Sequence, residues 1–332
     1  MSGAVESMQS MTEDGGLGPE IRHPLEIVGC PVCGGSSHRP RHTVVGYTIV
    51  DCTGCGLTFV NPQPTESDLA FFYEHIFHTP GWYRRFPQMR DFDYFGEAAG
   101  DQAGHQSYVT QVRGVIPGGA WLDVGCGHGA LVRFAAEAGY DAYGVDPNPL
   151  AARAAEERVG AGRVFSGTVH SAGFPANRFS VVSIIGTVEH LKHPRQTLQE
   201  IFRILQPGGL ILLQTPNLAS LQYRRQGPGW EQFTPPGHLI YFTPRTLSRM
   251  LRRAGFRRVR FDMRFPLGEG WERGSVGAPR RHRRLGLTLA RGVALLGSRV
   301  ERAMQRAKGR LVGNHDIVCH ARKPGQLPGR PR

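Results

Sequence analysis

From residue 116 onward, segments with the pattern of buried strands alternate with segments that have the pattern of helices. Strand patterns cover 120–125, 141–146, 163–169, 180–188, 210–216, 256–264 and 315–324, and helix patterns cover 130–139, 149–160, 195–205 and 243–255. Alternation of this kind is typical of a parallel sheet whose faces are covered by helices. The sequence therefore predicts an α/β fold built on a seven-stranded, mostly parallel sheet.

A glycine-rich turn follows the first of these strands. Its sequence is Asp123-Val-Gly125-Cys-Gly127-His-Gly129, between an apolar strand and a helix, where a parallel sheet holds its ligand. Glycine lets a ligand contact the backbone, which a Cβ atom would obstruct. About twenty residues further on, the second strand ends in Asp146, where a carboxylate can accept hydrogen bonds from both ribose hydroxyls. Together they indicate a nucleotide-like ligand.

The chemistry of this turn distinguishes two ligands. Gly125, Gly127 and Ala130 also satisfy the dinucleotide fingerprint, so the glycines alone leave a nicotinamide cofactor open. Asp123 stands two residues before the first glycine, where a carboxylate repels a pyrophosphate and attracts a cation. S-adenosylmethionine carries an ammonium and a sulfonium, so Asp123 favours this ligand.

Residues 118–262 resemble the class I S-adenosylmethionine-dependent methyltransferase family, in particular its ubiquinone-type and sugar-type members, which have a Rossmann-like fold. The resemblance rests on LDVGCGHG, YGVDPN, GTVEHLKHPRQTLQEIFRILQPGGLILLQTPN and HLIYFTPRTLSRMLRRAGF. It implies that Gly125 and Gly127 contact the amino acid part of the cofactor, that Asp123 lies near its ammonium, and that Asp146 binds its ribose. The further cofactor-binding residues that it implies are Cys126, Gly129, Pro147, Gly186 and, beside the adenine, Thr168 and Val169.

Candidates for the transfer step follow the fourth and fifth strands. Glu189 and His190 lie in GTVEHLKHP, and His238 and Tyr241 lie in TPPGHLIYFTP, so all four should face the cofactor cleft. Methyl transfer depends mainly on placement of the acceptor, with a base where the acceptor must lose a proton. We expect His238 to be that base. Two alternatives stay open: Glu189 and His190 pair with each other and cap the next helix, and Tyr241 packs in the core.

Four cysteines near the N-terminus have the spacing of a zinc ribbon. Cys30 and Cys33 form one Cys-x-x-Cys pair, Cys52 and Cys55 form another, and a strand pattern lies between the pairs. Four thiolates close a tetrahedral shell and leave no position for water, so we expect structural Zn²⁺ in a ribbon spanning 23–62.

The remaining segments are assigned from composition and pattern. We expect a disordered tail at 1–22, an aromatic-rich helical cap at 63–115 and a catalytic core at 116–264. The last strand of this core follows separately at 314–325, and a second tail covers 326–332. A basic insertion at 265–313 contains an amphipathic helix at 285–310. The basic, amphipathic pattern predicts that this helix contacts a membrane surface peripherally, or else that it forms a lid or a dimer contact.

Charge and hydropathy bound the partners. The formal net charge is +13, but only three of the forty basic residues are lysine, which is typical of a GC-rich genome as much as of a nucleic-acid partner. No apolar run reaches the length of a membrane span, and the N-terminus lacks a signal-peptide pattern. We expect a cytoplasmic enzyme.

Three functions remain at this point. The first is methylation of a small-molecule acceptor such as a sugar nucleotide, a quinone-like phenol or a secondary metabolite. The second is RNA methylation, which the ribbon and the basic charge support, although GTVEH lacks the Asn/Asp-Pro-Pro-aromatic motif used on exocyclic base amines. The third is a non-catalytic binding module. We expect a small-molecule acceptor and no nucleic-acid partner, and the sequence leaves the oligomeric state open.

Overall fold

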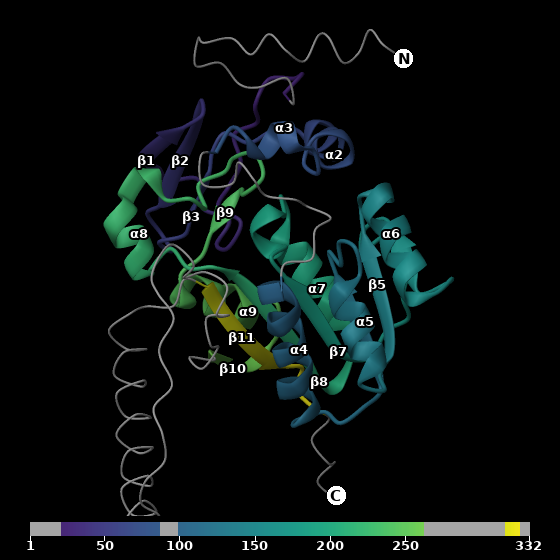
Figure 1. Ribbon diagram of the computed structural model, residues 1–332. Coiled ribbons are helices and arrows are strands. Elements are labelled where there is room, and N and C mark those ends of the chain that lie inside the picture. The colour runs from purple at the N-terminus through teal and green to yellow at the C-terminus, as the bar shows by residue number, and fades with distance from the viewer. Residues whose placement is uncertain (1–20, 87–98, 262–315, 326–332) are drawn as a thin grey trace, which may run out of the picture.

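A computed structural model describes residues 21–86, 99–261 and 316–325, and its centre is a seven-stranded sheet with the order β10-β11-β8-β7-β4-β5-β6 (Figure 1). The strands are β4 (Ala120–Val124), β5 (Asp141–Asp146), β6 (Val164–Ser166), β7 (Phe179–Ile185), β8 (Leu205–Pro216), β10 (Arg257–Phe261) and β11 (Asp316–Arg322). The five neighbouring strands β8, β7, β4, β5 and β6 are parallel to one another. Strand β11 pairs antiparallel with both β8 and β10. The predicted α/β fold with a mostly parallel, seven-stranded sheet is confirmed.

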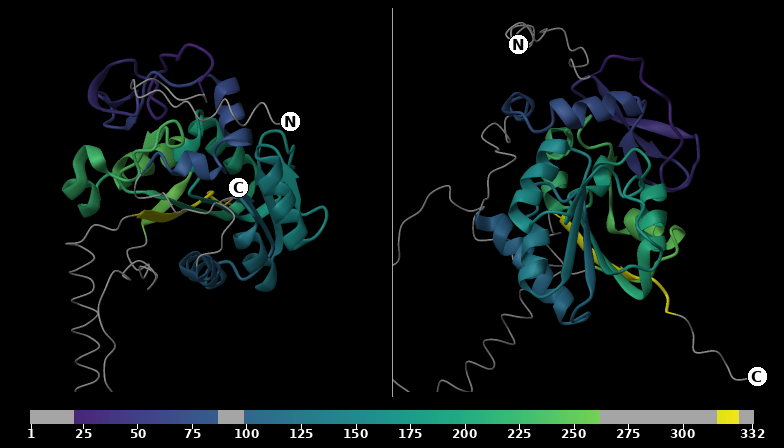
Figure 2. Two further views of the ribbon diagram at one scale, coloured as in Figure 1. Left: turned by 45° about the horizontal axis from the view of Figure 1, so that its top comes forward. Right: turned by 90° about the vertical axis from the view of Figure 1, so that its right-hand side faces the viewer.

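Helices cover both faces of this sheet because successive residues of its buried strands point to opposite sides. Trp121 packs in one cluster with residues of α4 (Ala99–Arg113), α5 (Ala130–Glu137) and α6 (Pro149–Val159). The next residue, Leu122, packs in another cluster with residues of α7 (Pro194–Ile204) and α9 (Pro244–Arg253). The layers are visible in the two further views (Figure 2).

A second sheet carries the N-terminal cysteines. It has the order β1-β2-β3-β9, with β1 (His38–Val44), β2 (Tyr47–Cys52), β3 (Thr58–Val60) and β9 (Ile240–Tyr241). The strand β9 comes from the chain after β8, and its residues pair with Thr58 and Phe59 of β3. The ribbon is therefore joined by backbone hydrogen bonds to the loop that carries His238.

Two helices of the aromatic-rich segment lie on the same side of the molecule as this second sheet, above the parallel sheet in the view of Figure 1. They are α2 (Glu66–His75) and α3 (Pro80–Tyr83), and their buried aromatic residues Phe72, Trp82 and Tyr83 share one cluster. Three short elements, η2 (Val188–His190), α8 (Leu221–Gln226) and η3 (Gly227–Gly229), complete the described part.

Several predictions fall on other parts of the chain. The basic insertion at 265–313 with its helix at 285–310, residues 87–98 of the predicted cap, the last tail and residues 1–20 lie outside the described residues. At the end of the predicted N-terminal tail, Ile21 packs against the core and the Arg22 backbone N–H donates to Asp68. The domain boundaries stay predictions. Among the residues that the structure describes, no helix is long and apolar enough to cross a membrane.

Candidate cofactor and acceptor site

The glycine-rich turn between β4 and α5 requires its glycines. Gly125 has a φ of 72°, and a Cβ added there would lie 2.4 Å from the Thr187 hydroxyl oxygen. Gly129 has a φ of 82°, and a Cβ added there would lie 2.9 Å from the Ala155 Cβ on α6. Both distances are too short for nonbonded carbon and oxygen atoms, so the turn keeps this shape only with glycine. The shape brings backbone N–H groups to the carboxyl ends of the strands.

Asp146 ends β5 beside this turn and is 6% exposed. One carboxylate oxygen accepts from the Gly127 N–H at 2.9 Å, and the other accepts from the Asn148 N–H at 2.9 Å. Burial raises the pKa of Asp146. Each carboxylate oxygen has a second lone pair, so the side chain retains acceptor capacity for a ligand hydroxyl. The adjacent Pro147 is exposed.

Asp123 lies at the end of β4 and is 4% exposed. Its carboxylate accepts from the Ser183 hydroxyl at 2.6 Å, and Ser183 in turn accepts from the Trp121 indole N–H at 2.8 Å. Burial raises the pKa of Asp123 to about 7, against the lowering effect of Ser183, and the negative charge of Asp146 adds to the rise. Two neighbouring buried carboxylates are costly without a cation.

The other predicted cofactor residues follow the same edge of the sheet. Cys126 is buried within the glycine-rich turn, and Gly186 follows β7, where its N–H donates to the Gln214 carbonyl. Beyond β6, Val169 is buried while Thr168 is exposed and its hydroxyl accepts from the Ser171 N–H. The structure therefore brings the cofactor candidates to the carboxyl ends of four parallel strands.

The transfer candidates meet next to this edge. The His190 and His238 rings pack edge to face with centroids 4.7 Å apart. One possible ligand atom from each of Glu189, His190 and His238 lies within 4.8 Å of the others. The Leu239 N–H donates to the Glu189 carbonyl at 2.9 Å, which holds the His238 loop on η2. Sequence separation of nearly fifty residues hides this proximity.

Glu189 is almost completely buried and accepts from the Thr215 hydroxyl at 2.9 Å. Burial raises its pKa to about 8, which keeps the carboxyl group protonated at neutral pH. The cap position of α7 is occupied by His193, which makes no capping side-chain hydrogen bond. The alternative that Glu189 caps this helix is therefore not what the structure shows.

The two histidines differ in the freedom of their nitrogens. His190 Nδ1 lies 2.8 Å from the Gly237 carbonyl oxygen, and the ring also faces the carbonyl of Gly186. His238 Nδ1 lies 2.8 Å from the Gln232 carbonyl oxygen. Burial lowers the pKa of His190 to about 3, with a contribution from His238, and burial lowers the pKa of His238 to about 4. Each ring is therefore neutral and carries its hydrogen on Nδ1, which leaves His238 Nε2 as a lone-pair acceptor.

Tyr241 lies on β9 and is 2% exposed. Its ring packs against Phe233 with centroids 4.8 Å apart, and its hydroxyl donates to the His238 carbonyl at 2.9 Å. It thus contacts the backbone of the candidate base from within the core. This arrangement matches the alternative in which Tyr241 packs in the core.

Three residues at the site, Ser183, Thr215 and Asn148, carried no prediction of a role, and Tyr73 was predicted only as part of the aromatic-rich cap. Ser183 and Thr215 donate to the buried acidic side chains of Asp123 and Glu189. Asn148 caps α6 beside Asp146, and Tyr73 contacts His190. Ser183 and Thr215 lie inside strand patterns, where a small polar residue gives no signal. Tyr73 belongs to the aromatic-rich segment, so only its type could have been noticed.

The four N-terminal cysteines form a compact cluster. The Cys30 and Cys55 sulfurs are 3.4 Å apart, as are those of Cys33 and Cys52, and all four lie within 4.8 Å of one another without a disulfide bond. Four sulfurs at the Zn–S distance of about 2.3 Å around a tetrahedral ion are about 3.8 Å apart. The cluster fits that geometry.

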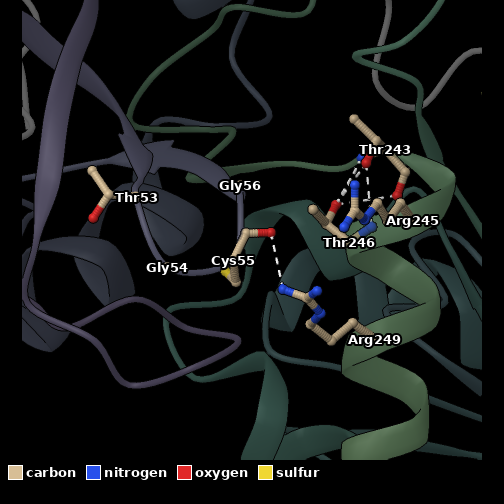
Figure 3. A pocket seen from close by; sticks show the side chains of 8 residues that line it. All are labelled: Thr53, Gly54, Cys55, Gly56, Thr243, Arg245, Thr246 and Arg249. Atoms are coloured by element: carbon tan, nitrogen blue, oxygen red, sulfur yellow. Dashed lines mark hydrogen bonds between the residues drawn. The ribbon is translucent and has the colours of Figure 1, made fainter.

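A polar cavity of about 320 Å³ lies between the second cysteine turn and α9 (Figure 3). Its lining residues come from Thr53–Gly56 on one side and from Thr243, Arg245, Thr246 and Arg249 on the other. The Arg249 guanidinium donates to the Cys55 carbonyl at 3.2 Å, and Arg253 donates to the Val32 carbonyl at 2.9 Å. This helix therefore holds both cysteine turns.

Comparison with known proteins gives a family match, two curated relatives and a solved structure. A family model described as a methyltransferase domain matches residues 108–260. The chain is 29% identical over 133 residues to a malonyl-[acyl-carrier protein] O-methyltransferase of Serratia marcescens, which covers 40% of this chain and 51% of that protein. It is 29% identical over 150 residues to a ubiquinone biosynthesis O-methyltransferase of Azoarcus sp., and this match covers 42% of this chain and 64% of that protein.

A solved structure of an S-adenosylmethionine-dependent methyltransferase from Archaeoglobus fulgidus is 22% identical, covers 66% of this chain and 94% of that chain, and has a TM-score of 0.45. The chain spans about half the length of the first curated relatives that it matches. The sequence match covers the glycine-rich turn and the parallel strands β4 to β8. Residues 108–260, which carry the parallel strands and the glycine-rich turn, therefore match the family model of a methyltransferase domain.

Proposed function

We propose that the protein transfers the methyl group of S-adenosylmethionine to a small-molecule acceptor. The observation that carries this proposal is the pair of buried carboxylates, Asp123 and Asp146, at a glycine-rich turn beside a cluster of neutral histidines. Buried carboxylates are stabilised by a cationic ligand and destabilised by a pyrophosphate. This supports an adenosyl sulfonium over a nicotinamide dinucleotide.

Each part of the cofactor has a matching group. Asp146 would accept from the ribose hydroxyls, Asp123 would lie near the ammonium, and Thr168 and Val169 would flank the adenine. The backbone from Gly125 to Gly129, with Pro147 and Gly186, would line the remainder. When bound, S-adenosylmethionine supplies an electrophilic methyl group.

The acceptor would lie against Glu189, His190 and His238. His238 Nε2 would take the acceptor's proton, because the His238 Nδ1 hydrogen is directed at the Gln232 carbonyl and leaves Nε2 with a lone pair, whereas the His190 ring faces the carbonyls of Gly237 and Gly186. Protonated Glu189 would add no negative charge next to the nucleophile. The relatives named as O-methyltransferases, of ubiquinone biosynthesis and of malonyl-[acyl-carrier protein], support an oxygen acceptor.

The first test is titration calorimetry with S-adenosylhomocysteine and with NAD. We expect S-adenosylhomocysteine to bind and NAD not to bind. Methyl transfer from tritiated S-adenosylmethionine to a panel of catechols and sugar nucleotides is then compared between the wild type and His238→Ala. The variant should lose turnover and keep its affinity for S-adenosylhomocysteine within about twofold. Binding of NAD alone would exclude the methyltransferase, and no binding at all would favour a non-catalytic module.

We also propose that Cys30, Cys33, Cys52 and Cys55 bind one structural Zn²⁺. The support is their mutual spacing and the positive φ of Gly34 and Gly56, which follow the two pairs. Metal analysis of the purified protein should find one zinc per chain, and Cys52→Ser should lower that content. The cytoplasmic location and the membrane contact through residues 285–310 stay predictions, and RNA remains the alternative acceptor.

A further inference from the structure

Tyr73 on α2 contacts the acceptor side of the site through its hydroxyl group. This hydroxyl donates to the Gly237 carbonyl at 2.9 Å and lies 3.3 Å from His190 Nδ1. The same carbonyl lies 2.8 Å from His190 Nδ1. Two donors from different elements therefore converge on the residue that directly precedes His238.

The backbone of Tyr73 contacts the cofactor side. Its carbonyl accepts from the Asn148 side-chain amide at 2.9 Å. The Asn148 backbone N–H donates to Asp146, and its side-chain oxygen caps α6. One residue of α2 is thus bonded both to the loop beside the candidate ribose ligand and to the loop of the candidate base.

Aromatic contacts hold Tyr73 in this place. Its ring lies edge to face with Phe77 at a centroid distance of 5.3 Å, and Phe77 in turn packs against the His190 ring at 5.4 Å. These contacts depend on the ring, whereas the bond to Gly237 depends on the hydroxyl. Removing the hydroxyl alone separates the two contributions.

We infer that Tyr73 is a positioning residue, which sets the place of the Gly237–His238 segment relative to the cofactor ribose. The inference rests on the proposed function and deepens it, because it makes helix α2 part of the acceptor site. Without the hydroxyl, the Gly237 carbonyl keeps only the His190 donor. The imidazoles of His190 and His238 are then no longer held in position by the Tyr73 hydroxyl of α2. Occupation of the cofactor site acts on the same segment through Asn148.

The test compares Tyr73→Phe with Tyr140→Phe. Tyr140 is a matched control because its hydroxyl also donates to a backbone carbonyl, that of Ile116, in the cluster on the opposite face of the sheet. Imidazole ¹⁵N resonances of His190 and His238 are recorded without any ligand. They should move in Tyr73→Phe and stay in place in Tyr140→Phe. Unchanged resonances in Tyr73→Phe would overturn the inference, whether or not the protein is a methyltransferase.

The coupling to the cofactor side is tested with Asn148→Ser, since serine can still cap α6 but cannot reach the Tyr73 carbonyl. Saturating S-adenosylhomocysteine should shift the His238 resonances in the wild type and shift them less in this variant. An equal shift in both would contradict the inference. Calorimetry with S-adenosylhomocysteine, run in parallel, separates this result from a failure of the proposed function, which would show as no binding by the wild type.

Turnover gives the last measurement. With any acceptor that the panel identifies, Tyr73→Phe should reduce kcat about five- to tenfold, in line with the loss of one hydrogen bond, and leave the KM for S-adenosylmethionine unchanged. Tyr140→Phe should leave kcat unchanged. An equal loss in both variants would indicate a structural effect and would overturn the inference.

Discussion

At the scale of single residues, the site is defined by ionisable groups that burial keeps neutral. Asp123 and Glu189 have raised pKa values, and His190 and His238 have lowered ones. At physiological pH the neutral imidazoles keep a ring lone pair, although their lowered pKa values make them weak bases. A carboxyl with a pKa near 7 can ionise when a cation arrives. The free protein is therefore poised to change the charge of Asp123 on binding.

The pH dependence of Asp123 can be measured in the free protein. Its folded pKa of about 7 exceeds the ordinary value of 3.8, so between these values the folded state binds more protons than the unfolded state. The Asp123 contribution to the free energy of unfolding therefore falls as pH rises through this window. Asp123→Asn removes that penalty and keeps an acceptor for Ser183. We expect the variant to gain thermal stability over the wild type at pH 8 and little at pH 4.

The same substitution should weaken the ligand. Binding of the S-adenosylhomocysteine ammonium requires the carboxylate form of Asp123, so wild-type affinity should rise about tenfold per pH unit up to pH 7 and level off above it. Removing one partner of a buried ion pair costs about 3–5 kcal/mol, so Asp123→Asn should lose about 150- to 5,000-fold in affinity at pH 8. A variant that binds like the wild type at pH 8 would remove Asp123 from the cofactor site.

At the scale of elements, two of the contacts that fix the cysteine ribbon to the rest of the chain come from the elements that directly follow the His238 loop. Strand β9 extends its sheet, and Arg249 and Arg253 of α9 donate to the Cys55 and Val32 carbonyls. The two contacts lie on consecutive elements that follow His238. A folded ribbon therefore helps to hold the loop that carries His238, the candidate base.

Replacing both arginines tests this attachment. Arg249→Met/Arg253→Met keeps the side-chain stems but removes two partly exposed hydrogen bonds of about 1 kcal/mol each. The melting temperature should fall by about 4–8 °C, and a chelator should remove zinc from the variant faster. The control is Arg245→Met/Arg252→Met, which changes two exposed arginines of the same helix. Equal effects of the two pairs would show that charge, and not attachment, is responsible.

The sequence predicts the long elements well because their patterns are local. Alternation of strands and helices, the glycine-rich turn and the cysteine spacing all follow from neighbouring residues, and the parallel sheet and the cysteine cluster are as expected. Strand β9 has only two residues and pairs with a strand more than 180 positions earlier, so no periodicity in the sequence predicts it. The contact between His190 and His238 depends on this pairing. The strand ends therefore place both histidines near the cleft, but only the folded chain shows that their rings touch.

At the scale of the whole molecule, the ribbon and the sheet share one hydrophobic core. A single cluster of buried side chains contains Tyr47 and Phe59 of the ribbon, Ile184 and Leu213 of the sheet, and Leu251 of α9. A continuous core makes the opening of one part costly for the other, because apolar contacts across the junction are lost together. The described chain should therefore unfold as one cooperative unit rather than as a ribbon and a catalytic domain.

Hydrogen exchange measured by mass spectrometry can decide this point on the full-length protein. Amides of β2 and β3 in the ribbon should exchange with the same free energy of opening as those of β7 and β8, because all four strands bury side chains in the shared core. Saturating S-adenosylhomocysteine should raise protection in both sets by the same amount, since a ligand that binds only the folded state adds RT ln(1 + [L]/Kd) to every global opening. Helix α8, which contains no buried residue, should exchange much faster and serves as the internal control. If the ribbon strands open at a lower free energy and do not respond to the ligand, the ribbon is an independent unit and the shared core does not couple it to the catalytic sheet.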